Sequence, residues 1–179
     1  MTRWWVHRRW ESRLAQQLNM SPRAATYVDT LIDHPKRFMY RYYDEESSTL
    51  LGRHWTSIGE CVERRLGDPR AAGGILAALR HGMIEHDWNT QRTSPKRRKT
   101  SASMLRMLRA VADCTIEPEA SLLAELHVAL DLISKLELYQ YTANKALQEL
   151  NHLELSQTTQ DFIKNNWNII SKDVEKAKT

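Results

Sequence analysis

Apolar residues recur every three or four positions along most of the chain, which is the spacing of one face of an α-helix. Near the N-terminus Trp10, Leu14 and Leu18 follow this spacing, and the predicted first helix covers residues 4–18. A further amphipathic helix is predicted over residues 52–66. The pattern therefore predicts helices that bury one face each.

Proline marks three expected helix starts, because it is favoured at the first helical position, directly after a capping residue. These starts are at Ser21-Pro22, Asp68-Pro69 and Glu117-Pro118. A break is expected at His34-Pro35, since the residue before proline resists the α conformation. Either Ser156 or Thr158 can cap a last helix.

A long helix after Pro118 carries an apolar stripe at near-heptad spacing, which is typical of bundle or coiled-coil packing. The stripe predicts contact with a protein partner, or self-association, through Leu122, Leu126, Ile133 and Leu136.

Only six Gly and five Pro occur, helix-forming residues dominate, and no convincing strand pattern is present. The expected fold class is all-α, a helical bundle of about seven or eight helices in one domain or two small lobes. The expected division is an Arg-rich lobe (1–88), a basic loop with a short connecting helix (89–117) and an acidic lobe with heptad-like stripes (118–179).

Composition narrows the class of protein. Apolar residues make up 41% and charged residues 27%, values typical of a chain that folds. Apolar runs are too short for a membrane span, and charges interrupt the N-terminus too early for a secretion signal. Cys61 and Cys114 lack a CxxC or zinc-binding spacing, so two inert thiols and a cytoplasmic location are expected.

Positive charge is concentrated in the first two thirds of the chain. Residues 1–112 carry 20 Lys and Arg against 11 Asp and Glu, a net charge of +9, whereas residues 113–179 carry 6 against 11, a net charge of −5. Such segregation favours contact with phosphate through the basic part. The alternative is that the arginines only solvate an ordinary surface.

The expected partner is RNA or single-stranded DNA. The tract SPKRRK lies in a stretch without acidic residues from 89 to 112, and would contact the nucleic-acid backbone, form a solvated linker, or act as a nuclear-import signal in a eukaryotic or viral protein. Two further segments, at 4–10 and 34–46, interleave aromatic and basic residues, which can stack bases and hold phosphates, although such aromatics are more often core residues. The candidate nucleic-acid-binding residues are Lys96, Arg97, Arg98, Lys99, Arg92, Arg106, Arg109, Arg80, Arg8, Arg9, Trp4 and Trp5.

Arg80, His81 and His86 resemble the catalytic motif of HEPN-family ribonucleases. That resemblance implies metal-independent RNA cleavage of the defence or toxin type, with Arg80 and His86 as the catalytic pair. The spacing alone occurs by chance in a chain with this many Arg and His residues. The alternative is a pair of exposed residues at a helix end, where a cation suits the helix dipole.

Two segments, 67–82 and 124–130, resemble the all-helical small subunit of type I CRISPR surveillance complexes over about a third of the chain. The resemblance implies a non-catalytic subunit in antiviral defence that contacts guide RNA and displaced DNA through their backbones. About 50 residues precede the matching part, and the chain is too short after it for a second bundle.

Other chemistry finds little support in the sequence. Glu149 and His152 form one ExxH pair, whereas di-iron bundles need two, so no metal site and no cofactor are expected. No Gly-rich phosphate loop or nucleophile motif is present. The sequence predicts a non-enzymatic, nucleic-acid-backbone-binding subunit of a larger assembly, with a HEPN-like ribonuclease and a helical protein-protein adaptor as alternatives.

Overall fold

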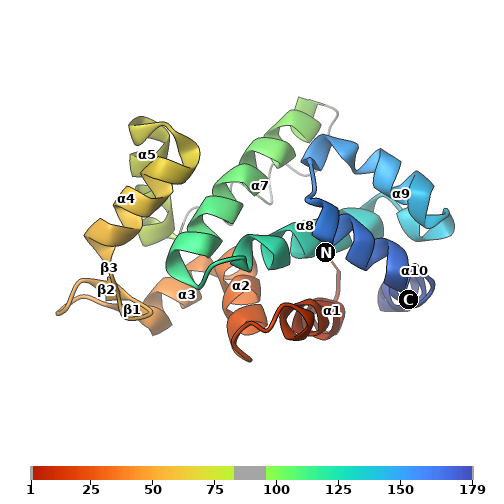
Figure 1. Cartoon of the computed structure of the whole chain (residues 1–179), viewed down its shortest axis with the longest axis horizontal. Coiled ribbons are helices and arrows are strands. Elements are labelled where there is room, and N and C mark those ends of the chain that lie inside the picture. The colour runs from red at the N-terminus through yellow and green to blue at the C-terminus, as the bar shows by residue number, and fades with distance from the viewer. Residues whose placement is uncertain (1, 83–95, 179) are drawn as a thin grey trace.

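The chain folds as a bundle of helices with one small sheet at its edge (Figure 1). The computed structural model describes residues 2–82 and 96–178, and for residues 96–101 it describes the backbone alone. The described residues form nine α-helices, which are α1 (Trp4–Gln17), α2 (Ala24–Asp33), α3 (Pro35–Tyr42), α4 (Trp55–Leu66), α5 (Pro69–His81), α7 (Lys96–Thr115), α8 (Ala120–Lys135), α9 (Ala143–Glu149) and α10 (Gln157–Lys178). Two 3-10 turns, Leu138–Gln140 and Asn151–Leu153, flank α9. The predicted all-α fold class is confirmed.

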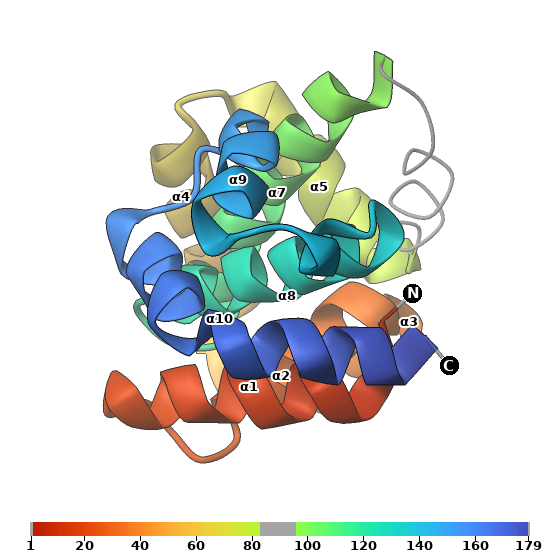
Figure 2. The same ribbon diagram turned by 90° about the vertical axis from the view of Figure 1, so that its right-hand side faces the viewer.

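Helix α8 runs through the middle of the bundle and packs against α1, α2, α7 and α10 (Figures 1 and 2). Every residue of α8 from 123 to 134 is buried, because the helix is apolar on nearly all sides. Within the predicted stripe, Leu126 and Ile133 face the core of this chain, Leu122 is half-buried and Leu136 is exposed. Most of the stripe is therefore internal packing.

One hydrophobic cluster contains residues from all three predicted segments, among them Trp10, Leu108 and Ile163. The N-terminal helix α1 lies beside the C-terminal helix α10, as Figure 2 shows. None of the described helices is long and apolar enough to cross a bilayer. The basic and acidic parts of the sequence thus share one core.

Several helix ends lie where local chemistry predicts them. The Asp68 side chain accepts hydrogen bonds from the backbone N–H groups of Arg70 and Ala71, so it caps α5. Helix α2 ends directly before His34, and α3 begins at Pro35. Ser156 lies before α10, where its Oγ accepts a hydrogen bond from the N–H of Thr159.

Three two-residue strands follow α3: β1 (Tyr43–Asp44), β2 (Thr49–Leu50) and β3 (Arg53–His54). They pair antiparallel in the order β1-β2-β3. Sequence analysis did not predict this sheet, because strands of two residues are too short to leave an alternating pattern.

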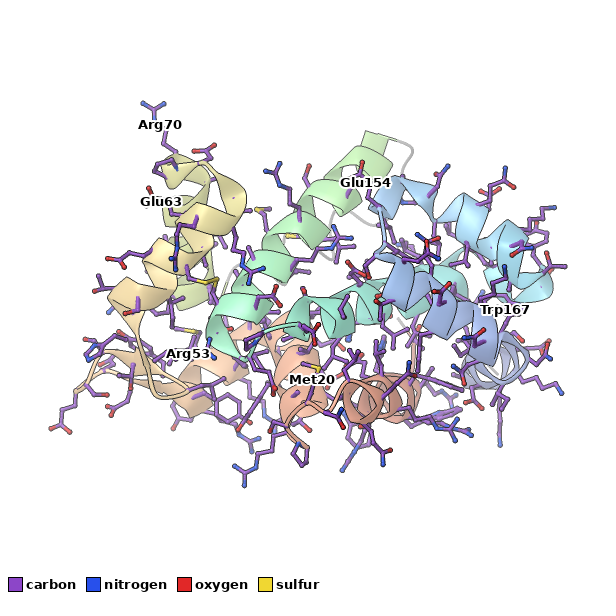
Figure 3. The ribbon with its side chains drawn as sticks, viewed as in Figure 1. Met20, Arg53, Glu63, Arg70, Glu154 and Trp167 are labelled. Atoms are coloured by element: carbon purple, nitrogen blue, oxygen red, sulfur yellow. A yellow bond between two sulfur atoms is a disulfide. The ribbon has the colours of Figure 1, made fainter. Side chains whose placement is uncertain are left out.

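The expectation of two unpaired thiols is wrong, since Cys61 of α4 and Cys114 of α7 form a disulfide. Their Cα atoms lie 5.8 Å apart, within the normal range for a disulfide. The pairing depends on helices 53 residues apart in sequence, so no local motif announces it. Arg53 (Figure 3) supports the same junction by donating hydrogen bonds to the backbone oxygens of Asp113 and Cys114.

Candidate metal centre

Three helices each place two side chains with metal-binding groups one turn apart, where the helices meet. Residues four positions apart lie on the same face of a helix, so each pair points into the same space. The six residues, named here the polar cluster, are His7 and Glu11 on α1, Asp29 and Asp33 on α2, and His127 and Asp131 on α8.

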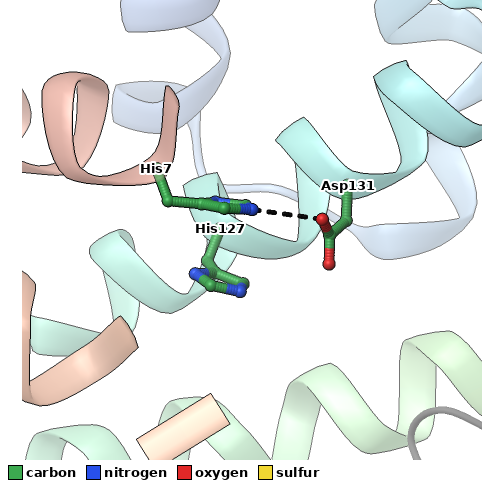
Figure 4. Close-up of side chains that lie close together, drawn as sticks. All are labelled: His7, His127 and Asp131. Atoms are coloured by element: carbon green, nitrogen blue, oxygen red, sulfur yellow. Dashed lines mark hydrogen bonds and ion pairs between the residues drawn. The ribbon is translucent and has the colours of Figure 1, made fainter. Parts of the chain in front are cut away.

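The two imidazole rings of the polar cluster stack face to face (Figure 4). Their centroids are 3.8 Å apart and their planes differ by 14°. His7 and His127 are both 0% exposed. The stacked pair therefore offers two edges of ring nitrogens to the surrounding carboxylates, and no ring atom to solvent.

At one edge both Nδ1 atoms face Glu11. Its Oε1 atom lies 3.2 Å from Nδ1 of His7 and 2.8 Å from Nδ1 of His127. Asp29 approaches the same edge, with Oδ1 4.0 Å from Nδ1 of His127. Two carboxylates therefore meet the Nδ1 edge.

At the opposite edge the Nε2 atoms face the other two carboxylates. Asp131 Oδ1 lies 3.1 Å from Nε2 of His7, and Asp33 Oδ1 lies 3.4 Å from Nε2 of His127. The backbone N–H of Thr2 also donates a hydrogen bond to Asp131 Oδ1. The Nε2 edge thus has two carboxylates as well.

Several buried atoms of the polar cluster have no hydrogen bond within the part of the chain that the structure describes. These atoms are Nδ1 of His7, Nε2 of His127, Oε2 of Glu11 and Oδ1 of Asp29. A buried polar atom without a partner costs roughly 1–3 kcal/mol. The helices are thus arranged around groups that their own hydrogen bonds do not satisfy.

The carboxylates shift the pKa values of the imidazoles upward. Burial alone would lower the pKa of His127, but the charges of Glu11 and Asp33 outweigh it and raise the pKa well above its usual value. Burial, and then the charge of Glu11, raises the pKa of Asp29 to about 6. The polar cluster therefore demands positive charge, from protons or from a cation.

Imidazole and carboxylate groups together are ligands for divalent transition metals such as zinc, manganese and iron. Two subsets have ligand atoms that lie within 4.8 Å of one another: His7, His127 and Asp131, and Glu11, Asp29 and His127. The residues present therefore fit a divalent metal.

Sequence analysis overlooked the polar cluster because it searched only for ExxH pairs. The signal that was available is the i, i+4 spacing in three helices, HxxxE, DxxxD and HxxxD. His127 and Asp131 also interrupt an otherwise apolar run, which is unusual for unpaired polar groups in a central helix. In contrast, His152 Nδ1 lies 3.2 Å from the backbone oxygen of Glu149.

The N-terminal candidates for nucleic-acid binding lie in different settings. Trp4 is 59% exposed, with the guanidinium of Arg8 4.9 Å from the centre of its ring. Trp5 is half-buried against the core. Arg9 forms an ion pair with Asp173 of α10 at 2.8 Å. Of these four, Trp4 and Arg8 are brought together at the surface.

Two candidates on α7 contribute to internal contacts. Arg109 pairs with Glu125 at 2.8 Å and donates hydrogen bonds to the backbone oxygens of Leu153 and Glu154. Arg106 donates a hydrogen bond to the backbone oxygen of Leu66. These arginines tie helices together.

Arg80 is exposed at the end of α5, with its guanidinium 5.6 Å from the ring centre of Tyr43. It lines a cleft with Lys36, Tyr40 and His81. His86 and Arg92 lie outside the described residues, as do the side chains of Lys96, Arg97, Arg98 and Lys99, whose backbone begins α7. The structure therefore does not show Arg80 and His86 as a pair.

No family model, curated protein or solved structure matches this chain. Its function is therefore argued from its own side chains.

Proposed function

We propose that this protein binds divalent transition-metal cations in the polar cluster. The observation that carries the proposal is the convergence of buried ring nitrogens and carboxylate oxygens that lack hydrogen bonds. At a metal-ligand distance of about 2.1 Å, neighbouring ligand atoms are about 3.0 Å apart in octahedral geometry and about 3.4 Å apart in tetrahedral geometry. The separations of 3.2 Å at Nδ1 of His7 and 3.4 Å at Nε2 of His127 agree with these values.

A structural role suits the buried position of the ligands. Four surface clefts in the described part of the chain are lined by residues outside the polar cluster. A metal there would hold α1 and α2 against α8, and its binding free energy would add to the stability of the fold. The proposed activity is therefore metal binding coupled to folding.

The test is metal content and thermal stability of the full chain. The purified protein should contain manganese, iron or zinc by elemental analysis, and removal of the metal with a chelator should lower Tm. Added Mn²⁺, Fe²⁺ or Zn²⁺ should restore it, because a ligand that binds only the folded state stabilises it. A metal-free protein whose Tm responds to none of these cations contradicts the proposal.

Variants locate the effect in the polar cluster. His127→Gln removes a central ligand and should abolish the metal-dependent rise in Tm. His54→Gln is the matched control, because His54 is exposed at the end of β3. Elemental analysis of the unaltered protein decides the question if His127→Gln fails to fold.

We propose nucleic-acid-backbone binding as a second candidate function. The exposed cleft with Lys36 and Arg80 favours it, since Tyr40 at its rim is 90% exposed and could stack an unpaired base beside these cations. This function would suit a CRISPR-like subunit in antiviral defence, the expectation from sequence. The ribonuclease and adaptor alternatives make different forecasts.

A single assay separates these alternatives. Retention and cleavage of labelled single-stranded RNA are measured for the unaltered protein and for Arg80→Ala. Binding predicts retention that weakens about 5- to 150-fold in the variant, the range of 1–3 kcal/mol. The control is Arg70→Ala, whose side chain points into solvent at the tip of α5 (Figure 3). Cleavage would favour the ribonuclease, and absence of both would favour the adaptor.

The cytoplasmic location stays a prediction, as does nuclear import through SPKRRK. The disulfide bears on it, because such bonds persist mainly in oxidising compartments. Thiol titration of protein taken directly from the producing cell, with thiols blocked at lysis, tests the state of Cys61 and Cys114.

A further inference from the structure

We infer that the polar cluster holds two cations, one at each edge of the stacked imidazole pair. The inference rests on the proposed metal-binding function and adds the number of ions and their ligands. The Nδ1-edge ion would take Nδ1 of His7 with Glu11 and Asp29. The Nε2-edge ion would take Nε2 of His127 with Asp33 and Asp131.

The stacked geometry excludes one shared ion. A nitrogen lone pair lies in the plane of its imidazole ring, so a bound metal also lies close to that plane. Because the rings of His7 and His127 are nearly parallel and 3.8 Å apart, an ion in one plane lies well outside the other. Each imidazole therefore binds its own ion.

The hydrogen bonds of the polar cluster assign one nitrogen of each ring to metal. His7 is hydrogen-bonded to Asp131 through Nε2, which leaves Nδ1 without a bond. His127 is hydrogen-bonded to Glu11 through Nδ1, which leaves Nε2 without one. Metal-binding histidines usually donate their other ring N–H to a carboxylate, which fixes the ring. The free nitrogens lie at opposite edges of the pair.

Charge balance gives the same number of ions. Each edge has two carboxylates, Glu11 with Asp29 and Asp33 with Asp131, and each pair carries two negative charges when ionised. One divalent cation neutralises each pair, whereas a single cation would leave two buried negative charges without compensation. Uncompensated buried charge is costly, so double occupancy is favoured.

Equilibrium dialysis of the metal-free full chain against Mn²⁺, and separately against Zn²⁺, counts the ions by elemental analysis. The expected result is two ions per chain. One ion per chain overturns this inference and leaves metal binding standing, whereas no bound ion overturns both.

Two isosteric variants test the assignment to the two edges. Asp29→Asn should weaken only the Nδ1-edge ion and Asp33→Asn only the Nε2-edge ion, each by at least about 100-fold, since outer-shell changes alone cost 10- to 100-fold. Each variant should keep one tight ion, and the double variant none. Asp161→Asn, on the exposed side of α10, is the control and should keep two. Loss of both ions in each single variant would mean a single joint site and would overturn the assignment, while the unaltered chain still gives the number of ions if a variant does not fold.

Discussion

Reduction of the Cys61–Cys114 disulfide should lower the free energy of unfolding by about 4 kcal/mol. The bond closes a loop of 53 residues between α4 and α7. By the chain-entropy relation, a loop of this length removes about 14 cal/mol/K from the unfolded state, or about 4 kcal/mol at 25 °C. For a chain of 179 residues this corresponds to a fall in Tm of about 8–16 °C.

The assay is urea unfolding of the oxidised and the reduced protein, followed by circular dichroism, with mass spectrometry to confirm the thiol state. The double variant Cys61→Ala, Cys114→Ala is the control, and reductant should leave its midpoint unchanged. A reduced protein that unfolds within about 1 kcal/mol of the oxidised one would refute the loop-entropy argument. Two free thiols in protein prepared without reductant would refute the pairing itself.

Three further perturbations have expected outcomes. Arg109→Ala should lower the free energy of unfolding by about 2–4 kcal/mol in urea melts, because it leaves the buried Glu125 carboxylate without its cation, and an unchanged midpoint would contradict that role. Asp68→Ala should cost only about 1 kcal/mol through the lost cap of α5, so a change above about 2 kcal/mol would show that Asp68 does more than cap. The metal-free protein should lose stability as the pH rises from 5 to 7.5: the pKa of Asp29 is raised from 3.8 to about 6, so the folded state holds this proton more tightly, and the stabilisation present below pH 4 is lost as the pH rises through 6. Urea melts in chelator at the two pH values measure this effect, and stability that rises with pH would contradict it.

Local patterns account for most of the helices. The i, i+3, i+4 spacing gave α1 within a residue of its observed ends, and Asp68 and His34-Pro35 placed two boundaries. The start expected at Pro22 lies two residues before α2, because the capping geometry forms at Arg23. Such features depend on neighbours in sequence, which is why they can be predicted.

The polar cluster and the disulfide depend on contacts between distant segments. His7 and Asp131 are 124 residues apart, and nothing near either residue identifies the other. A search for helical pairs of His, Asp and Glu finds three candidates, but their convergence follows only from the packing of α1 and α2 on α8. Local chemistry therefore suggested the helices, while long-range packing defined the candidate metal centre.

The sequence distance between α1 and α8 has a consequence for biosynthesis. His7 and Glu11 meet their partners on α8 only after more than 120 further residues have been made. At about 5–20 residues per second, the ribosome needs roughly 6–25 seconds for that length, and contacts this distant also slow folding itself. During this interval α1 has no partner for its buried face, and any metal taken up by the polar cluster must enter late, as the central helix joins the first two.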